Sequence, residues 1–159
     1  MKRFFENFEF VVASIAFVFM ILFVSLNVFT RYIIGYSMSF SEEVAYLSFT
    51  YVVFFGICML FKYQALVAID VLVERFPEKV QKFVEVFIYA FLTVVNAILI
   101  YYSVILTVQA WGRPTASLRI PYSFVDAPAV YAFTVMFVYS VRFLIEAIRN
   151  LRSDNISVE

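Results

Sequence analysis

Four charged residues lie beside long apolar segments and could carry chemistry. Glu42 and Glu43 are adjacent carboxylates directly before an uncharged run, and Arg31 follows the run before that. Asp126 is the acid most able to fall inside a membrane span. Paired carboxylates can perform acid–base chemistry or bind cations, and an acid within a membrane is a functional hypothesis by default. A substrate or ion site at Glu42 and Glu43 therefore stays open.

A structural role for the same residues is the interpretation we favour. Ser41, with Ser39 as a second candidate, is expected to cap a helix whose first turn holds the two glutamates. Acidic residues in a first turn also favour the helix dipole. Arg31 is the opposite charge nearest in sequence to Glu42 and Glu43, which predicts an ion pair between the first two helices.

Asp126 and the single cysteine have simpler interpretations. Asp126 precedes Ala127 and Pro128, a pattern that indicates a helix cap more than a proton relay. The chain has no histidine, and its one cysteine, Cys58, lies in an apolar run. Disulfides within the chain, Cys/His metal sites and nucleophile–histidine pairs are therefore excluded. We expect no cofactor, no metal and no enzymatic activity.

The elements around these residues are apolar enough to cross a membrane. Hydrophobic residues make up 64% of the 159 residues, and charged residues 15%, against about 45–50% and about 25% in soluble domains. A spanning helix needs about 20 apolar residues. The first run is too long for a signal peptide. We predict an all-α bundle of four transmembrane helices in a single domain, with spans at about 10–32, 43–62, 84–111 and 123–145.

Orientation follows from the lysines and arginines near the spans. Nine of the 12 fall on the side that holds both termini and the connection between spans two and three, and three fall on the other side. Cytoplasmic segments carry the excess, so both termini are predicted in the cytoplasm of a bacterial inner membrane. Segment 66–76 is predicted to form a short interfacial amphipathic helix, although an extension of the flanking spans outside the membrane is the alternative.

Small and mildly polar residues form stripes along the second and third spans. Such residues mark helix–helix contacts in lipid, so a packing role is expected for all of them. The stripe residues are Ala45, Ser48, Gly56, Thr93, Asn96 and Ser103.

The same pattern separates the function classes. A proton-coupled carrier needs an acid near the midplane of the membrane, and spans one to three hold none. A channel needs rings of charged residues or a filter loop, and the sequence shows neither. The zero net charge gives no basic footprint for nucleic acid. An accessory membrane subunit fits best. A self-assembling four-helix carrier or channel is the alternative, and an enzyme using Glu42 and Glu43 is the weakest hypothesis.

Four motifs resemble the small membrane subunit of tripartite ATP-independent periplasmic (TRAP) transporters. They are Asn27–Tyr32, Phe40–Glu43, Ala68–Leu72 and Leu118–Tyr122. In the last of these the family prefers Leu-Gly-Ile-Pro, so Arg119 replaces a small residue and is expected to alter the outer surface. The segment before Ala68 also lacks the family's basic, Gly- and His-containing turn.

The resemblance implies a place in a larger assembly. Such subunits widen the static scaffold of a large membrane permease, which holds the substrate and sodium sites and moves like an elevator. A soluble periplasmic binding protein delivers an organic acid, such as sialic acid or a C4-dicarboxylate, and the sodium gradient drives uptake. The partners implied are therefore the permease, the binding protein and the lipid bilayer. The outer loops Ile33–Ser41 and Trp111–Ser123 are expected to face the binding protein.

Overall fold

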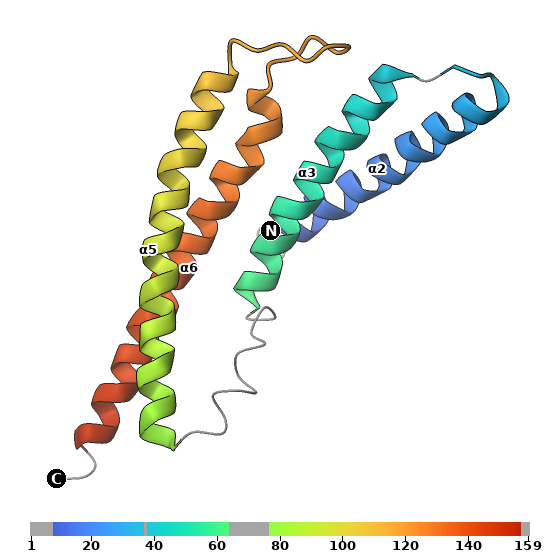
Figure 1. Cartoon of the computed structure of the whole chain (residues 1–159). Helices are drawn as coiled ribbons and strands as arrows, with labels where there is room; N and C mark the ends of the chain where they lie inside the picture. Colours follow the sequence, from blue (N-terminus) through green and yellow to red (C-terminus); the bar gives the residue numbers. More distant parts are fainter. Residues whose placement is uncertain (1–7, 37, 64–76, 157–159) are drawn as a thin grey trace. The chain divides into compact units, whose positions relative to one another are not determined.

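The computed structural model describes residues 8–36, 38–63 and 77–156, and four helices occupy most of them. The helices are α2 (Phe8–Ile33), α3 (Ser39–Lys62), α5 (Glu78–Ala110) and α6 (Ser123–Ile156) (Figure 1). All four are long and apolar enough to cross a membrane, and no strand forms among the described residues. The predicted all-α class with four spanning helices is confirmed.

The helix ends differ from the expected spans in ways that local chemistry explains. α5 begins at Glu78, because the carbonyl of Pro77 accepts the N–H groups of Val80 (2.8 Å) and Gln81 (3.1 Å) and so starts the helix. Its first turns are charged, so the helix is longer than its apolar part. α6 likewise continues to Ile156, beyond the predicted 145. The predicted interfacial helix at 66–76 lies outside the described residues.

The helices contribute to two compact units, Met1–Met59 with Tyr102–Ala132 and Leu60–Tyr101 with Phe133–Glu159. In the first unit, aromatic rings of α2, α3 and α6 form the main cluster. Phe55 stacks on Tyr131 with ring centroids 4.9 Å apart, and Phe8 meets the same two rings at 6.1 and 6.3 Å. Aromatic pairs at these separations add to the energy of burial, so this cluster holds the three helices together.

In the second unit, Phe143 of α6 lies against Tyr89 of α5 and Phe61 of α3, at centroid distances of 5.5 and 6.2 Å. Elsewhere between α5 and α6, Asn96 of α5 and Ser140 of α6 are buried side by side, with exposed fractions of 2% and 0%. Their contact is polar, as expected where helices meet in lipid.

The four helices are covered unequally by their own chain. Of the most apolar stretch of α2 and of α5, 6% of the residues are buried, against 22% for α3 and for α6. Large apolar side chains such as Phe17, Phe29, Phe87 and Val108 are about half exposed or more. In a membrane protein these faces meet lipid tails or a partner helix.

Candidate functional site

The turn between α2 and α3 is fixed by one glycine and one carboxamide. Gly35 has a φ of 73°, the left-handed conformation that ends many helices. Asn27 of α2 then bonds to the start of α3 through both polar atoms. Its Nδ2 donates to Glu42 Oε1 (3.1 Å), and its Oδ1 accepts from the backbone N–H of Met38 (3.3 Å). The Asn27 side chain therefore ties the two helix ends together.

The predicted cap at Ser41 is wrong. α3 begins at Ser39, and the carbonyl of Met38 accepts the N–H of Ser41 at 2.9 Å, so Ser41 already lies within the first turn. Its hydroxyl is fully buried and donates to the carbonyl of Phe23 on α2 at 2.7 Å. Ser41 thus joins two helices, a role in which serine is favoured in lipid.

Glu43 holds the connection between α5 and α6. Its two carboxylate oxygens accept the backbone N–H groups of Ser117 (2.6 Å) and Leu118 (2.8 Å). Hydrogen bonds to an ionised acceptor are short and strong. The partners described for Glu42 and Glu43 therefore include Asn27 and this loop, and the ion pair with Arg31 stays a prediction.

The connection held by Glu43 is a small hairpin (Figure 1). The N–H of Thr115 donates to the carbonyl of Ile120 (2.8 Å), and the N–H of Tyr122 to the carbonyl of Arg113 (2.9 Å). The Thr115 hydroxyl accepts the N–H of Ile120 at 3.2 Å. Arg119 closes the turn with a φ of 54°. Glycine adopts this φ readily, whereas a residue with a side chain does so at a cost.

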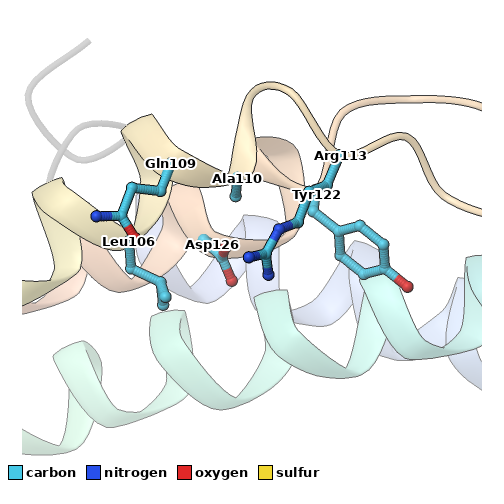
Figure 2. A pocket seen from close by; sticks show the side chains of 6 residues that line it. All are labelled: Leu106, Gln109, Ala110, Arg113, Tyr122 and Asp126. Carbon is cyan, nitrogen blue, oxygen red and sulfur yellow. The ribbon is translucent and has the colours of Figure 1, made fainter.

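Two cavities open beside this hairpin. The larger, about 410 Å³, is lined by Glu42, Glu43 and residues of the hairpin. The smaller, about 180 Å³, is lined by Arg113 and Asp126 together with Tyr122 and residues of α5. Figure 2 shows the Arg113 guanidinium between the Asp126 carboxylate and the Tyr122 ring. Opposite charges therefore line the smaller cavity.

The position of Asp126 differs from the one predicted. α6 begins at Ser123, three residues earlier than Asp126, and the N–H of Asp126 already donates to the carbonyl of Tyr122 at 3.2 Å. Asp126 is thus a first-turn residue and not a residue preceding the helix. An acid in the first turn still favours the helix dipole, while its part in ion pairing or capping stays a prediction.

Pro128 of α6 frees a backbone carbonyl that a residue of α3 binds. Proline has no N–H, so it leaves the carbonyl four residues earlier, that of Phe124, without its helical donor. The hydroxyl of Tyr51 donates to that carbonyl at 3.2 Å. The Cys58 thiol, seven residues further along α3, contacts the carbonyl of Ala132 at 3.6 Å. One face of α3 therefore lies along α6 through polar contacts to its backbone.

The predicted packing residues lie in different environments. Ser48, Asn96 and Ser103 are buried, whereas Ala45, Gly56 and Thr93 are partly exposed. Asn96 Nδ2 donates to the carbonyl of Leu92 (2.8 Å) and to Ser140 Oγ (3.4 Å), but its buried Oδ1 has no partner. A methyl group at Gly56 would meet no atom within 4 Å. Their packing roles in an assembly stay predictions.

Glu9 is a buried residue that the sequence pattern did not single out. It lies in the first turn of α2, is 7% exposed, and accepts a hydrogen bond from the Tyr131 hydroxyl at 3.4 Å. The sequence feature that could have identified Glu9 is its position as an acid directly before a long apolar run. Among residues 8–36, 38–63 and 77–156, no group of three or more His, Cys, Asp or Glu could hold a metal ion.

Glu42 and Glu43 thus connect the start of α3 to other parts of the chain: their carboxylates accept N–H groups from the Asn27 side chain and from the hairpin backbone. Comparison with known proteins agrees with the sequence motifs. A family described as "Tripartite ATP-independent periplasmic transporters, DctQ component" matches residues 20–150. A TRAP transporter small permease protein of Haemophilus influenzae is 28% identical over 128 residues, which cover 77% of this chain and 78% of that protein. The resemblance drawn from the sequence is confirmed, and the chain belongs to the DctQ-component family of TRAP transporters.

Proposed function

We propose that the chain is the scaffold subunit of a sodium-coupled TRAP transporter, bound to a large elevator-type membrane permease that carries the substrate. The observation that carries this proposal is the unequal cover of the helices. Only 6% of the residues in the most apolar stretch of α2, and likewise of α5, are buried by the chain itself. Apolar faces of this length need lipid or partner helices. A subunit that widens a permease within the bilayer uses such faces on both sides.

The charged residues support the same role. Glu42 and Glu43 accept hydrogen bonds from Asn27, Ser117 and Leu118 at helix ends. Both carboxylates also line the larger cavity, but they lie in the first turns of α3 and not midway along a spanning helix, where the charges of a transport pathway are found. We propose that Arg31, Glu42, Glu43 and Asp126 fix the helix ends, and that the stripe residues named above pack helices together.

The orientation of the chain in the inner membrane belongs to the proposal. The charge asymmetry of nine basic residues to three favours cytoplasmic termini. The connections 34–38 and 111–122 then face the periplasm, where a soluble binding protein delivers the substrate. We propose an organic acid as that substrate, either sialic acid or a C4-dicarboxylate, with uptake driven by the sodium gradient and without ATP. Membership of a tripartite transporter family supports the binding-protein partner.

Co-expression with the genes beside this one tests the proposal. We expect the tagged chain to purify with a large permease, and the reconstituted pair to take up substrate only with the binding protein and a sodium gradient. The chain alone serves as control and should give no flux. A chain that runs as a stable homodimer, recruits no permease and transports alone would contradict the proposal and favour a self-assembling carrier.

A further inference from the structure

The tip of the hairpin between α5 and α6 carries a strained arginine. Among the described residues, Arg119 is the one residue other than glycine with a positive φ, 54°. For an L-residue this region is unfavourable, because Cβ comes too close to the following carbonyl oxygen, and glycine would remove the cost. Backbone strain that persists is a pointer to function. We therefore infer that the arginine side chain has a function that offsets the backbone strain.

The hairpin fixes the point from which this side chain departs. On one side of Arg119, the N–H of Leu118 is bound to Glu43 Oε2 at 2.8 Å. On the other side, the N–H of Ile120 is bound to the hydroxyl of Thr115 at 3.2 Å, and Thr115 is 5% exposed. Both neighbours of Arg119 are thus held to the body of the unit. The backbone at Arg119 is therefore held in place, and its side chain is exposed to solvent.

The hairpin itself supplies no acidic residue to balance the charge at its tip. Segment 111–122 contains two arginines and no acidic residue. Arg113 shares its cavity with Asp126, and the Glu43 carboxylate is directed to the backbone of the turn. Within the part of the chain that the structure describes, the Arg119 side chain forms no ion pair. Its charge is available to a partner.

We propose that Arg119 is a contact residue for an acidic surface on a soluble protein, which the proposed function identifies as the periplasmic binding protein. The proposal rests on that function. Lipid phosphates are a weaker fit, because a long arginine side chain reaches them from many backbone conformations and would need no strained, held backbone. A protein surface presents its carboxylates at fixed places. A held backbone limits where the guanidinium can reach, which suits carboxylates at fixed places, and no loop has to be ordered on binding.

Three variants of the assembled transporter test the proposal. Arg119→Gly removes the side chain and relieves the strain, so it should fold at least as well as the parent. Arg119→Lys keeps the charge. Arg149→Gln removes an exposed charge from α6, far along the chain, and is the matched control. Each transporter is placed in nanodiscs of zwitterionic lipid and, separately, of anionic lipid, and binding of the purified binding protein is measured at several salt concentrations.

We expect Arg119→Gly to weaken binding about tenfold at low salt, mainly through slower association, and to flatten the salt dependence. Arg119→Lys should recover most of the affinity, and Arg149→Gln should behave as the parent. Unchanged affinity and salt dependence in Arg119→Gly would overturn the proposal alone. A defect found only in nanodiscs of anionic lipid would also overturn it, in favour of lipid binding. A parent transporter that recruits no binding protein would overturn the proposed function as well.

Discussion

The hydroxyl of Tyr51 donates a hydrogen bond of 3.2 Å to the backbone carbonyl of Phe124. This carbonyl lies four residues before Pro128, which has no N–H to offer it. A free carbonyl in the membrane costs several kcal/mol if nothing binds it. Tyr51 on α3 therefore supplies the donor that α6 lacks, and the proline in one helix is matched by a phenol in another.

This relationship predicts that the effects of Tyr51 and Pro128 are coupled. Tyr51→Phe should lower the free energy of unfolding by about 0.6–1.5 kcal/mol, because the Phe124 carbonyl loses its donor. Pro128→Ala restores an N–H four residues after Phe124. In that background Tyr51→Phe should cost little. Thermal unfolding of the purified transporter measures all four members of this double-mutant cycle.

A control separates the hydroxyl from the ring in this cycle. Tyr46→Phe removes a hydroxyl from another tyrosine of α3, one that is 58% exposed, and should cost the same small amount with or without Pro128. Equal costs of Tyr51→Phe in the two backgrounds would show that the phenol does not serve the carbonyl freed by the proline.

The spanning helices were predictable because their signal is local. Each span corresponds to an uncharged run of 15 to 27 residues, so its approximate length can be seen from that part of the sequence alone. Helix ends were harder to place. The Asp126–Ala127–Pro128 pattern predicts a start after Asp126, but α6 begins at Ser123. A proline inside a membrane helix is tolerated where a neighbouring helix binds the freed carbonyl, as Tyr51 does here.

The partners of the site residues were not predictable, for a physical reason. Glu43 binds the N–H groups of residues 74 and 75 positions away, and every non-proline residue carries such a group. Side-chain type therefore gives no clue to the contact. The nearest opposite charge, Arg31, was a reasonable candidate on sequence distance alone. Arg119 carried a better signal: a family preference for Gly indicates a positive φ, which the hairpin has.

A second prediction concerns Glu43 and the hairpin. Glu43→Ala removes both acceptors of the Ser117 and Leu118 N–H groups. Hydrogen exchange of these amides, followed by mass spectrometry of the loop peptide, should become clearly faster. Glu42→Gln is the matched control, since the described partners of Glu42 include Asn27 and an amide oxygen can still accept its hydrogen bond. Unchanged protection in Glu43→Ala would mean that the turn holds its shape without the carboxylate.

A third prediction concerns the polar contact between α5 and α6. Asn96 is 2% exposed, and its Oδ1 has no partner. Asn96→Asp would bury a charge there and should cost about 2.5–3.5 kcal/mol of the free energy of unfolding. Asn96→Leu removes the unpaired oxygen at similar shape and should change stability by less than about 1.5 kcal/mol.

The contrast between these two Asn96 variants is the informative result. Ser140 is the other polar group at this contact, and its hydroxyl can bond to its own helix when Asn96 is lost. Thermal unfolding in detergent compares the variants with the parent. A large loss in Asn96→Leu would show that the carboxamide contributes more than its single weak bond to Ser140 suggests.

The last prediction uses two glycines to ask where a partner helix lies. Gly35 has a φ of 73°, so Gly35→Ala should destabilise the chain by about 1 kcal/mol, both in the isolated chain and in the assembled transporter. Gly56 lies inside α3 with open space around it. Gly56→Ala should therefore be neutral or up to about 1 kcal/mol favourable in the isolated chain, because alanine is the better helix former.

The same Gly56→Ala change acts differently if a permease helix approaches α3 closely. Small residues allow helix backbones to come near each other in lipid, and an added methyl group would push such a helix away. We expect Gly56→Ala to leave the isolated chain intact but to reduce the amount of permease that purifies with it. Gly35→Ala should lower the yield of the folded chain and the amount of co-purified permease by similar factors, because it acts through stability. Full recovery of permease with Gly56→Ala would place the partner on another face, and the apolar sides of α2 and α5 would then be the surfaces to probe.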